Sequence, residues 1–320
     1  MRHTNKSSTY HSDSRGARLV ADADKEPVLP VIRLSMRLAK PVEEVWSTFV
    51  DPLIMLQWLG NEVTADIRKG GSIRFLGKNA PTNSVIGDTW TIDKFQNGRA
   101  MLCSWGIMGV DTLFLIRFTQ ESTGTLLELK HGAIPVSASA LHIPEHWGIL
   151  LANFKSVMEL GEPAIRFDYS DYRPLSITRY DPKEVRQSVL IRAPPSLPFD
   201  VFTNPEKLRH FIRAEKPKVD RQYAGIYTWW AEGKGPVLFR KMSAEKEIEF
   251  SWVYEDEPET IVNVRFDAAE DNTLVTLHHY GFREPEAAIG YDVGWTSILC
   301  ELKLVCELGE SGITRVSEWV

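Results

Sequence analysis

The sequence has few cysteines and no long apolar run, and these two shortages exclude several classes of protein. Its three cysteines, Cys103, Cys300 and Cys306, are an odd number at spacings that match neither a disulfide framework nor a zinc ribbon. We therefore expect a reducing, cytoplasmic location. No stretch of the sequence approaches the about 18 consecutive apolar residues that a membrane-spanning helix requires. The sequence therefore predicts neither a secreted, disulfide-bonded scaffold nor a membrane-spanning protein.

Clusters of positive charge are also absent. The formal net charge is −6, and Lys and Arg never form a run longer than a pair. This balance argues against a nucleic acid or an anionic membrane surface as the partner. A hydrophobic fraction of 43% with 25% charged residues is typical of globular domains with real cores. An apolar small molecule, a lipid or another protein remains as the expected partner.

The familiar catalytic and metal-binding motifs are missing or broken. The sequence contains no Gly-x-x-x-x-Gly-Lys phosphate loop and no Gly-x-Ser-x-Gly elbow. His142, Glu145 and His146 match the His-x-x-Glu-His spacing of some zinc peptidases, but Pro144 lies between them and is tolerated only in the first turn of a helix. His142 is then expected outside the helix. We predict no metal, no cofactor and no catalytic residue.

The first 29 residues are polar and contain no apolar core, which excludes an ordinary secretory signal. We expect a disordered N-terminal tail here, with an organelle transit peptide as the alternative.

The rest of the chain repeats itself. The segment WGILLANFKSVMELGE from Trp147 aligns with WTSILCELKLVCELGE from Trp295 at a constant offset of 148 residues. Upstream, Ser104-Trp105 matches Ser251-Trp252, and the segment 46–58 matches 199–211. The sequence therefore predicts two copies of one domain, at 30–165 and 184–311, joined by a linker at 166–183 and followed by a C-terminal tail at 312–320.

Each copy shows the same order of elements. A short alternating strand is followed by two small helices that are separated at Asp51-Pro52 and Asn204-Pro205, because the residue before proline leaves the helical region. Several strands with glycine turns follow, and a long amphipathic helix ends at Gly161 or Gly309. This is an α+β layout, a curved antiparallel sheet wrapped around a long C-terminal helix.

These residues resemble a known family. The Val-Trp-x-x-x-Val-Asp-Pro segment at 45–52, the glycine pair at 70–71, and the His-Tyr-Gly-Phe and Gly-Trp-x-x-Ile-Leu runs within 279–299 are similar to the SRPBCC, or START-like, superfamily. Within it they look most like activators of the heat-shock protein 90 ATPase. The resemblance implies two tandem helix-grip (Bet v 1-like) domains, each with an apolar pocket beneath the long helix. Copy one departs from the usual ending, because Gly132-Ala-Ile-Pro replaces the His-x-Gly-Phe run.

The candidate ligand-binding residues lie on several strands of each sheet, including the last one, and on the long helix. Histidines recur at equivalent positions on the last strand, where each could contact a ligand or simply bond to the backbone. The aromatic residues could likewise line a pocket or pack a core. The candidates are Trp90, Trp105, His131, Trp147, Leu151 and Phe154 in copy one, and Trp229, Trp252, His279, Trp295, Leu299 and Leu302 in copy two.

Three hypotheses of function follow from the sequence. The leading one is non-catalytic binding of an apolar small molecule or lipid. The second is a chaperone-associated interaction module, and the third is a cyclase- or hydrolase-type enzyme that uses His131 or His279. Pattern alone leaves open the ligand, the oligomeric state and which of the two pockets functions.

Overall fold

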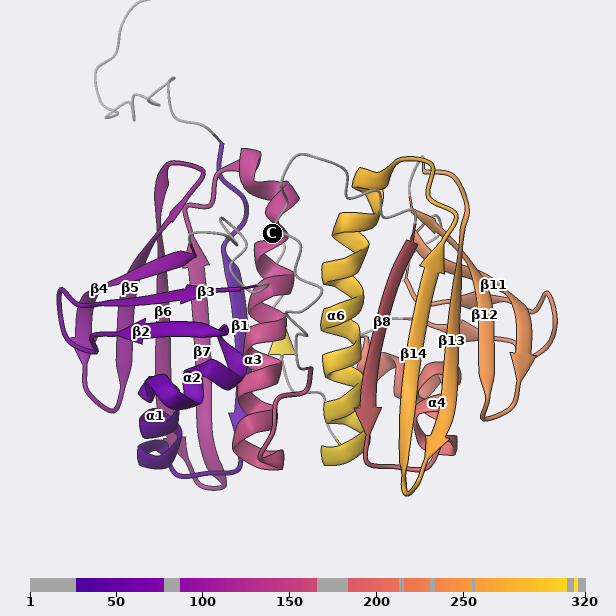
Figure 1. The fold of residues 1–320 in the computed structure, drawn as a ribbon, viewed down its shortest axis with the longest axis horizontal. Helices are drawn as coiled ribbons and strands as arrows, with labels where there is room; N and C mark the ends of the chain where they lie inside the picture. The colour runs from indigo at the N-terminus through magenta and orange to yellow at the C-terminus, as the bar shows by residue number, and fades with distance from the viewer. Residues whose placement is uncertain are drawn as a thin grey trace, which may run out of the picture.

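Figure 1 shows the computed structural model, which describes residues 27–77, 87–165, 184–212, 214, 216–230, 234–254, 257–309 and 314–315. Most of the predicted N-terminal tail and the whole of the predicted linker, 166–183, lie outside these residues. The described fold begins before the expected boundary at residue 30, because Val28 bridges Pro135 and the Leu29 N–H donates to the Ile134 carbonyl at 2.7 Å.

The two copies have the same order of elements, as the repeat predicts. Copy one contains β1 (Ile32–Leu38), α1 (Val42–Val50), α2 (Pro52–Trp58), β2 (Glu62–Ala65), β3 (Ser72–Leu76), β4 (Asp88–Gln96), β5 (Ala100–Ile107), β6 (Val110–Glu121), β7 (Gly124–Gly132), the 3-10 helix η1 (Val136–Leu141) and α3 (Ile143–Leu160). Copy two contains β8 (Glu184–Ile191), α4 (Ser196–Thr203), α5 (Pro205–Phe211), β9 (Lys218–Val219), β10 (Tyr227–Thr228), β11 (Lys234–Ser243), β12 (Glu247–Tyr254), β13 (Thr260–Ala269), β14 (Asn272–Tyr280) and α6 (Pro285–Leu308), with β15 (Thr314–Arg315) after it.

Antiparallel sheets form the outer walls of the molecule and the long helices lie between them (Figure 1). In copy one the strand order is β15-β1-β7-β6-β5-β4-β3-β2, and in copy two it is β11-β12-β13-β14-β8 with a separate β10-β9 pair. Each sheet curves around its own long helix. The two tandem helix-grip domains predicted from the sequence are confirmed.

The helix boundaries follow from local chemistry. The Asp51 side chain accepts a hydrogen bond from the Leu53 N–H at 2.8 Å, and Asn204 caps α5 in the same way through the Glu206 N–H at 3.0 Å. Both are N-cap residues followed directly by proline at the first helical position. Gly161 and Gly309 end the long helices with φ near +79°, a left-handed conformation that costs glycine little.

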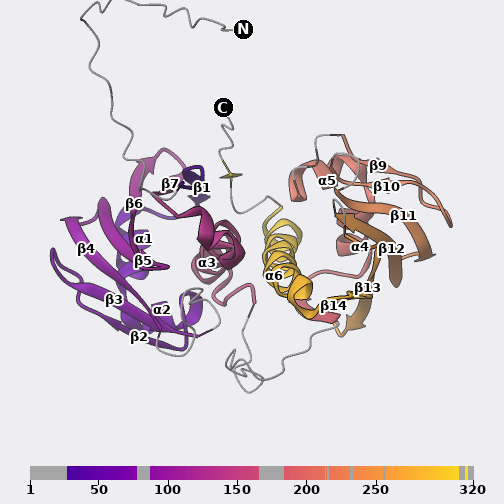
Figure 2. The ribbon, with the colours of Figure 1, turned by 90° about the horizontal axis from the view of Figure 1, so that it is seen from above.

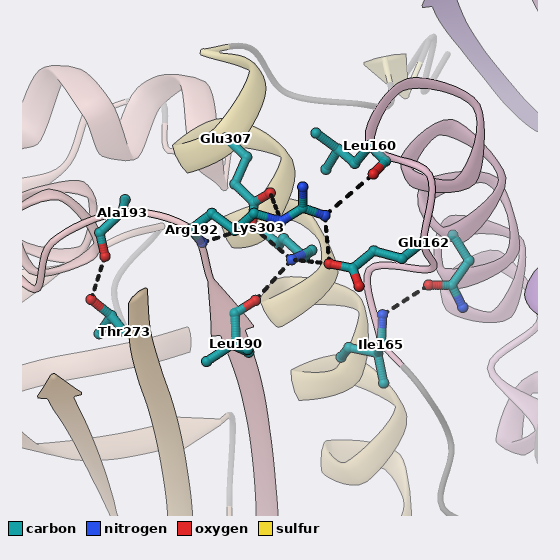
Figure 3. A network of polar contacts seen from close by, with 10 residues as sticks. Leu160, Glu162, Ile165, Leu190, Arg192, Ala193, Thr273, Lys303 and Glu307 are labelled. Atoms are coloured by element: carbon teal, nitrogen blue, oxygen red, sulfur yellow. Dashed lines mark hydrogen bonds and ion pairs between the residues drawn. The ribbon is translucent and has the colours of Figure 1, made fainter. Parts of the chain in front are cut away.

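The copies meet along their long helices, which pack side by side at the centre of the molecule (Figure 2). β15 crosses back to copy one and pairs with β1, so part of the predicted C-terminal tail at 312–320 is a strand. Glu162, just after α3, accepts hydrogen bonds from Arg192 at 2.7 Å and from Lys303 at 3.4 Å (Figure 3). The hydrogen bond from Arg192, with the charge of Lys303, lowers the pKa of Glu162.

A buried ion pair holds each long helix to the first strand of its own copy. Lys155 Nζ donates to the Arg37 carbonyl at 2.6 Å and pairs with Glu159 at 2.9 Å, while Glu159 accepts from the Ala39 N–H at 2.8 Å. Lys303 and Glu307 form the equivalent ion pair in copy two, with Lys303 Nζ 2.6 Å from Glu307 Oε1. The side chains of Lys155 and Glu159 are only 1% and 9% exposed.

Replacing Lys155 by methionine should therefore destabilise copy one. The substitution leaves the Glu159 carboxylate buried without its cation, a change that costs about 3 kcal/mol or more. Urea unfolding followed by tryptophan fluorescence measures the loss. Lys40→Met is the control, because both side chains of the Lys40–Glu44 ion pair are exposed to solvent. Exposed pairs of this kind contribute about 1 kcal/mol or less to the free energy of unfolding. Equal effects of the two substitutions would contradict the prediction.

Candidate functional site

The space between sheet and long helix contains the residues predicted to line a pocket in each copy. All twelve are buried, with exposed fractions between 0% and 5%. Leu151, Leu299 and Leu302 belong to the helix face that packs on the sheet. The aromatic members contact one another, so side chains fill the predicted pocket volume.

The aromatic rings of copy one form two groups. In the first, Trp90 stacks on Trp147 with centroids 5.3 Å apart, and Trp105 stacks on His131 at 5.6 Å. Phe154 belongs to the second group, nearer the small helices, where it meets Phe49 and Trp58, each at 5.2 Å. The structure thus brings Trp90, Trp105, His131 and Trp147 together and places Phe154 apart from them.

A chain of hydrogen bonds passes through the buried histidine of copy one. The Trp147 indole N–H donates to His131 Nδ1 at 3.0 Å, and His131 Nε2 lies 2.8 Å from the Thr112 hydroxyl. Indole nitrogen is only a donor, so Nδ1 must accept, and neutral histidine then carries its proton on Nε2. The Thr112 hydroxyl accepts a hydrogen bond from Nε2–H and donates one to the Trp105 carbonyl at 2.8 Å. Both ring nitrogens of His131 are therefore engaged.

Copy two repeats this arrangement around His279. The Trp295 indole donates to His279 Nδ1 at 3.0 Å, and Nε2 lies 2.7 Å from the Thr260 hydroxyl. Burial lowers the pKa of His131 to about 4, and burial together with the nearby His278 lowers that of His279 to about 3. Both histidines are neutral near pH 7 and have no free nitrogen for proton transfer. Their role in this geometry is to fix the long helix on the sheet.

Cys103, on the same inward face as Trp105, offers no nucleophile. Burial, assisted by the charge of Asp93, raises the pKa of its thiol to about 12. The thiolate is the reactive form of cysteine, so this thiol is inert near neutral pH.

Several buried indole groups lack an acceptor. In copy one the Nε1 atoms of Trp90 and Trp105 have no hydrogen-bond partner among the described residues, and the two rings lie 6.0 Å apart. Buried donors without a partner are uncommon and require an explanation. Two neighbouring buried tryptophans of copy one thus each carry an indole N–H without an acceptor.

In copy two, tyrosine hydroxyls lie near the buried indoles of Trp229, at the repeat position of Phe75, and of Trp252, at that of Trp105. Burial raises the pKa of Tyr227, and the indole of Trp229 opposes this rise; Trp252 opposes the rise of Tyr291 in the same way. Neither the Trp229 nor the Trp252 indole N–H, however, forms a hydrogen bond with a described residue. Isoleucines, Ile73 and Ile143, stand at these two positions of the repeat in copy one. Copy one therefore lacks the two hydroxyls that lie near the indoles of copy two, although Trp229 and Trp252 also have no hydrogen-bond partner among the described residues.

Sequence reasoning missed the partners of the histidines and the buried ion pairs. Thr112 and Thr260 keep the offset of 148 residues, as do Lys155 and Lys303, so the repeat carried a signal for them. The tyrosines at 227 and 291 carried no such signal, because they occur in one copy only.

The His-x-x-Glu-His segment begins α3 as the proline predicts. His142 is the N-cap, with a left-handed φ of 48°, and helix residues start at Ile143. A Cβ placed on Gly290 of α6 would lie 2.7 Å from His142 Nε2, so this side chain packs at the contact between the copies. In the described part of the chain, no three His, Cys, Asp or Glu side chains form a metal-binding group.

The sheet, the long helix and the interior define a helix-grip domain present twice. The sequence profile of the family described as Activator of Hsp90 ATPase homolog 1-like protein matches residues 39–159 and 192–307. The chain belongs to this family. A comparison with curated proteins finds no match.

Several solved structures are similar to the chain. DynU16, described as a putative protein in the dynemicin biosynthetic locus, is 18% identical, with 87% of this chain and 99% of that one covered and a TM-score of 0.38. CalU16 from Micromonospora echinospora is 25% identical over 43% of this chain and 85% of its own, with a TM-score of 0.35. The Aha1 dimer from Colwellia psychrerythraea is 14% identical over 42% and 98%, with a TM-score of 0.36. None of the helices in the described residues has the length and apolar character needed to cross a membrane.

Stability should fall with mild acid because of the buried histidines. Between the ordinary pKa of 6.5 and the folded value of about 4, the unfolded chain binds a proton at His131 that the folded chain does not. The free energy of unfolding therefore decreases as the pH falls through this window, by about 2 kcal/mol per histidine between pH 7 and pH 5. Urea unfolding at a series of pH values measures the slope. A flat profile down to pH 5 would show that the histidines titrate normally.

Proposed function

We propose that copy one binds a small apolar molecule, or a lipid, that carries a hydrogen-bond acceptor and lies beneath α3 between the rings of Trp90, Trp105 and Trp147. The observation that supports this most directly is the pair of buried indole donors without acceptors. A carbonyl, ether or hydroxyl oxygen of a ligand accepts from such donors, and the surrounding rings provide apolar contact.

Binding of this kind is coupled to movement. The rings of copy one are in mutual contact, with Trp90 stacked on Trp147 of the long helix. A ligand enters only if these rings separate, so α3 or the Trp90 side chain must shift. Association then includes a conformational step and is slow. The ligand leaves without chemical change, because the histidine nitrogens are engaged and the Cys103 thiol is protonated.

The two copies have different roles in this proposal. Tyrosine hydroxyls lie beside the indoles of copy two, and only apolar side chains stand at those positions in copy one. Copy one is the binding domain. Copy two supports it through the α3–α6 contact and through β15, which extends the copy one sheet.

Trp105→Phe tests this proposal. Phenylalanine keeps an aromatic ring and removes one donor, so affinity should fall about 3- to 10-fold, the value of one neutral hydrogen bond. Native mass spectrometry of the purified protein, with denaturing extraction, identifies a co-purified ligand. Tryptophan quenching by the neutral probe N-phenyl-1-naphthylamine gives the affinities.

Trp252→Phe is the matched control, because Trp252 occupies the same position in copy two. Its affinity should equal that of the unmodified chain. Equal losses in both variants, or no saturable binding in any of them, would refute the assignment to copy one.

A protein-interaction function is the second candidate, and an exposed apolar surface on copy two favours it. Tyr223, Ile226, Trp230 and Val237 are 79%, 53%, 39% and 37% exposed. They lie on β11 and on the segment that pairs with it, where Ile226 bridges Leu238. Apolar groups gathered on one edge are typical of binding surfaces. The family suggests a chaperone of the heat-shock protein 90 type as the partner.

The ATPase rate of such a chaperone, measured with and without the chain, tests this candidate. The chain should increase the rate, and Ile226→Ser should reduce the increase severalfold by weakening the apolar contact. Leu53→Ser is the control, because Leu53 is 76% exposed but lies on α2 of copy one. An unchanged ATPase rate would remove this function.

A further inference from the structure

A surface hollow in copy one is separate from the interior described above. Its volume is about 730 Å³, within the roughly 300–1,000 Å³ range of small-molecule sites. It lies where the start of α1, the β4–β5 turn and β6 meet. Its lining residues come from three segments, 42–43, 96–100 and 117–120.

Two arginines give this hollow its charge. The side chains of Arg99 and Arg117 both line it. Among the described residues neither guanidinium has a hydrogen-bond or ion-pair partner. Phe118 also lines the hollow, but its side chain is 3% exposed and packs against Trp46 and Phe49 on the inward face of β6.

The same place in copy two keeps both positive charges but has acidic residues around them. The Phe118 N–H donates to the Arg99 carbonyl at 2.7 Å, and the Phe266 N–H donates to the Lys246 carbonyl at 2.8 Å. Lys246 is therefore the counterpart of Arg99. Ala100 faces Arg117 across the strands as Glu247 faces Arg265, so these positions also correspond.

Carboxylates surround the arginine of copy two and are replaced in copy one. Arg265 forms an ion pair with Asp267 at 3.0 Å and has Glu247 opposite it. A third acid, Glu245, occupies the left-handed turn position that Gly98 occupies in copy one. Thr119, Ala100 and Gly98 stand in place of the three acids, and all three line the hollow. Copy two neutralises its arginine internally, whereas copy one leaves two cations open.

The remaining polar groups around the hollow mainly donate. Asn97 uses its oxygen to accept from the Trp46 indole at 3.0 Å, which leaves its NH₂ group as a donor. Gln120 accepts from the Val42 N–H and donates to two carbonyls, so it is fully engaged. The acidic groups nearby are Glu43, which also lines the hollow, and Glu128, opposite Arg117 on β7, which forms no ion pair with that arginine.

We infer that this hollow binds a small anion, with a carboxylate or phosphate group held by Arg99 and Arg117. Guanidinium groups pair with both kinds of oxyanion through two parallel hydrogen bonds. The Asn97 NH₂ group and the Thr119 hydroxyl provide further donors.

Isothermal titration calorimetry with inorganic phosphate and with succinate, at low ionic strength, tests this site in the full chain. We expect saturable binding of at least one anion. Phosphate binding alone would indicate a phosphorylated ligand, and succinate binding alone a carboxylate. Arg117→Gln should weaken binding about tenfold or more, because a charge-assisted hydrogen bond is lost. Arg99→Gln should have a similar effect.

Two further variants use the repeat as a control. Thr119→Asp restores the acid that copy two has, so it should neutralise Arg117 and abolish most of the binding. Arg265→Gln changes the counterpart in copy two and should leave the affinity unchanged, as should Trp105→Phe in the interior. These arginines and the threonine are on the surface, and unchanged thermal unfolding confirms that each variant is folded. Binding of neither anion, or equal binding by all variants, would overturn the inference.

Discussion

The hydrogen bond from the long-helix tryptophan to the last-strand histidine is the contact on which each domain depends. It joins α3 to β7 through Trp147 and His131, and α6 to β14 through Trp295 and His279. A helix packed on a sheet by apolar contact alone can slide. A single donor and acceptor in a dry interior fix both its position and its rotation, because any shift leaves two buried polar groups unpaired.

The buried lysine–glutamate pair does the same at the other end of the helix. Lys155 bonds to the backbone of Arg37 near the end of β1 and Glu159 to that of Ala39 just after it, so the C-terminal half of α3 is attached to the start of the copy. With both ends fixed, the rings between them face the sheet in one arrangement. The unpaired indoles of Trp90 and Trp105 lie in this interior, and they are the observation that supports the proposed ligand in copy one.

Duplication has allowed the two copies to diverge in separate places. Copy two has tyrosines beside its indoles and carboxylates around Arg265. Copy one lacks both and is joined to copy two through Glu162, which meets Arg192 and Lys303. The common framework is retained in both, while the polar side chains near the buried indoles and around the surface arginine differ between the copies.

The sequence alone determined the two copies, the order of elements and the inward residues, because the strand alternation, the Asp51-Pro52 boundary and the helix period depend on local geometry. Part of the candidate site was also predictable, since the repeat marked His131 and His279 as equivalent. Only the tertiary structure decided what these histidines bond to, because Thr112 and Trp147 come from other elements. It also decided that rings fill the interior, and that Arg99 and Arg117 share a hollow, since charge and volume depend on which distant segments meet.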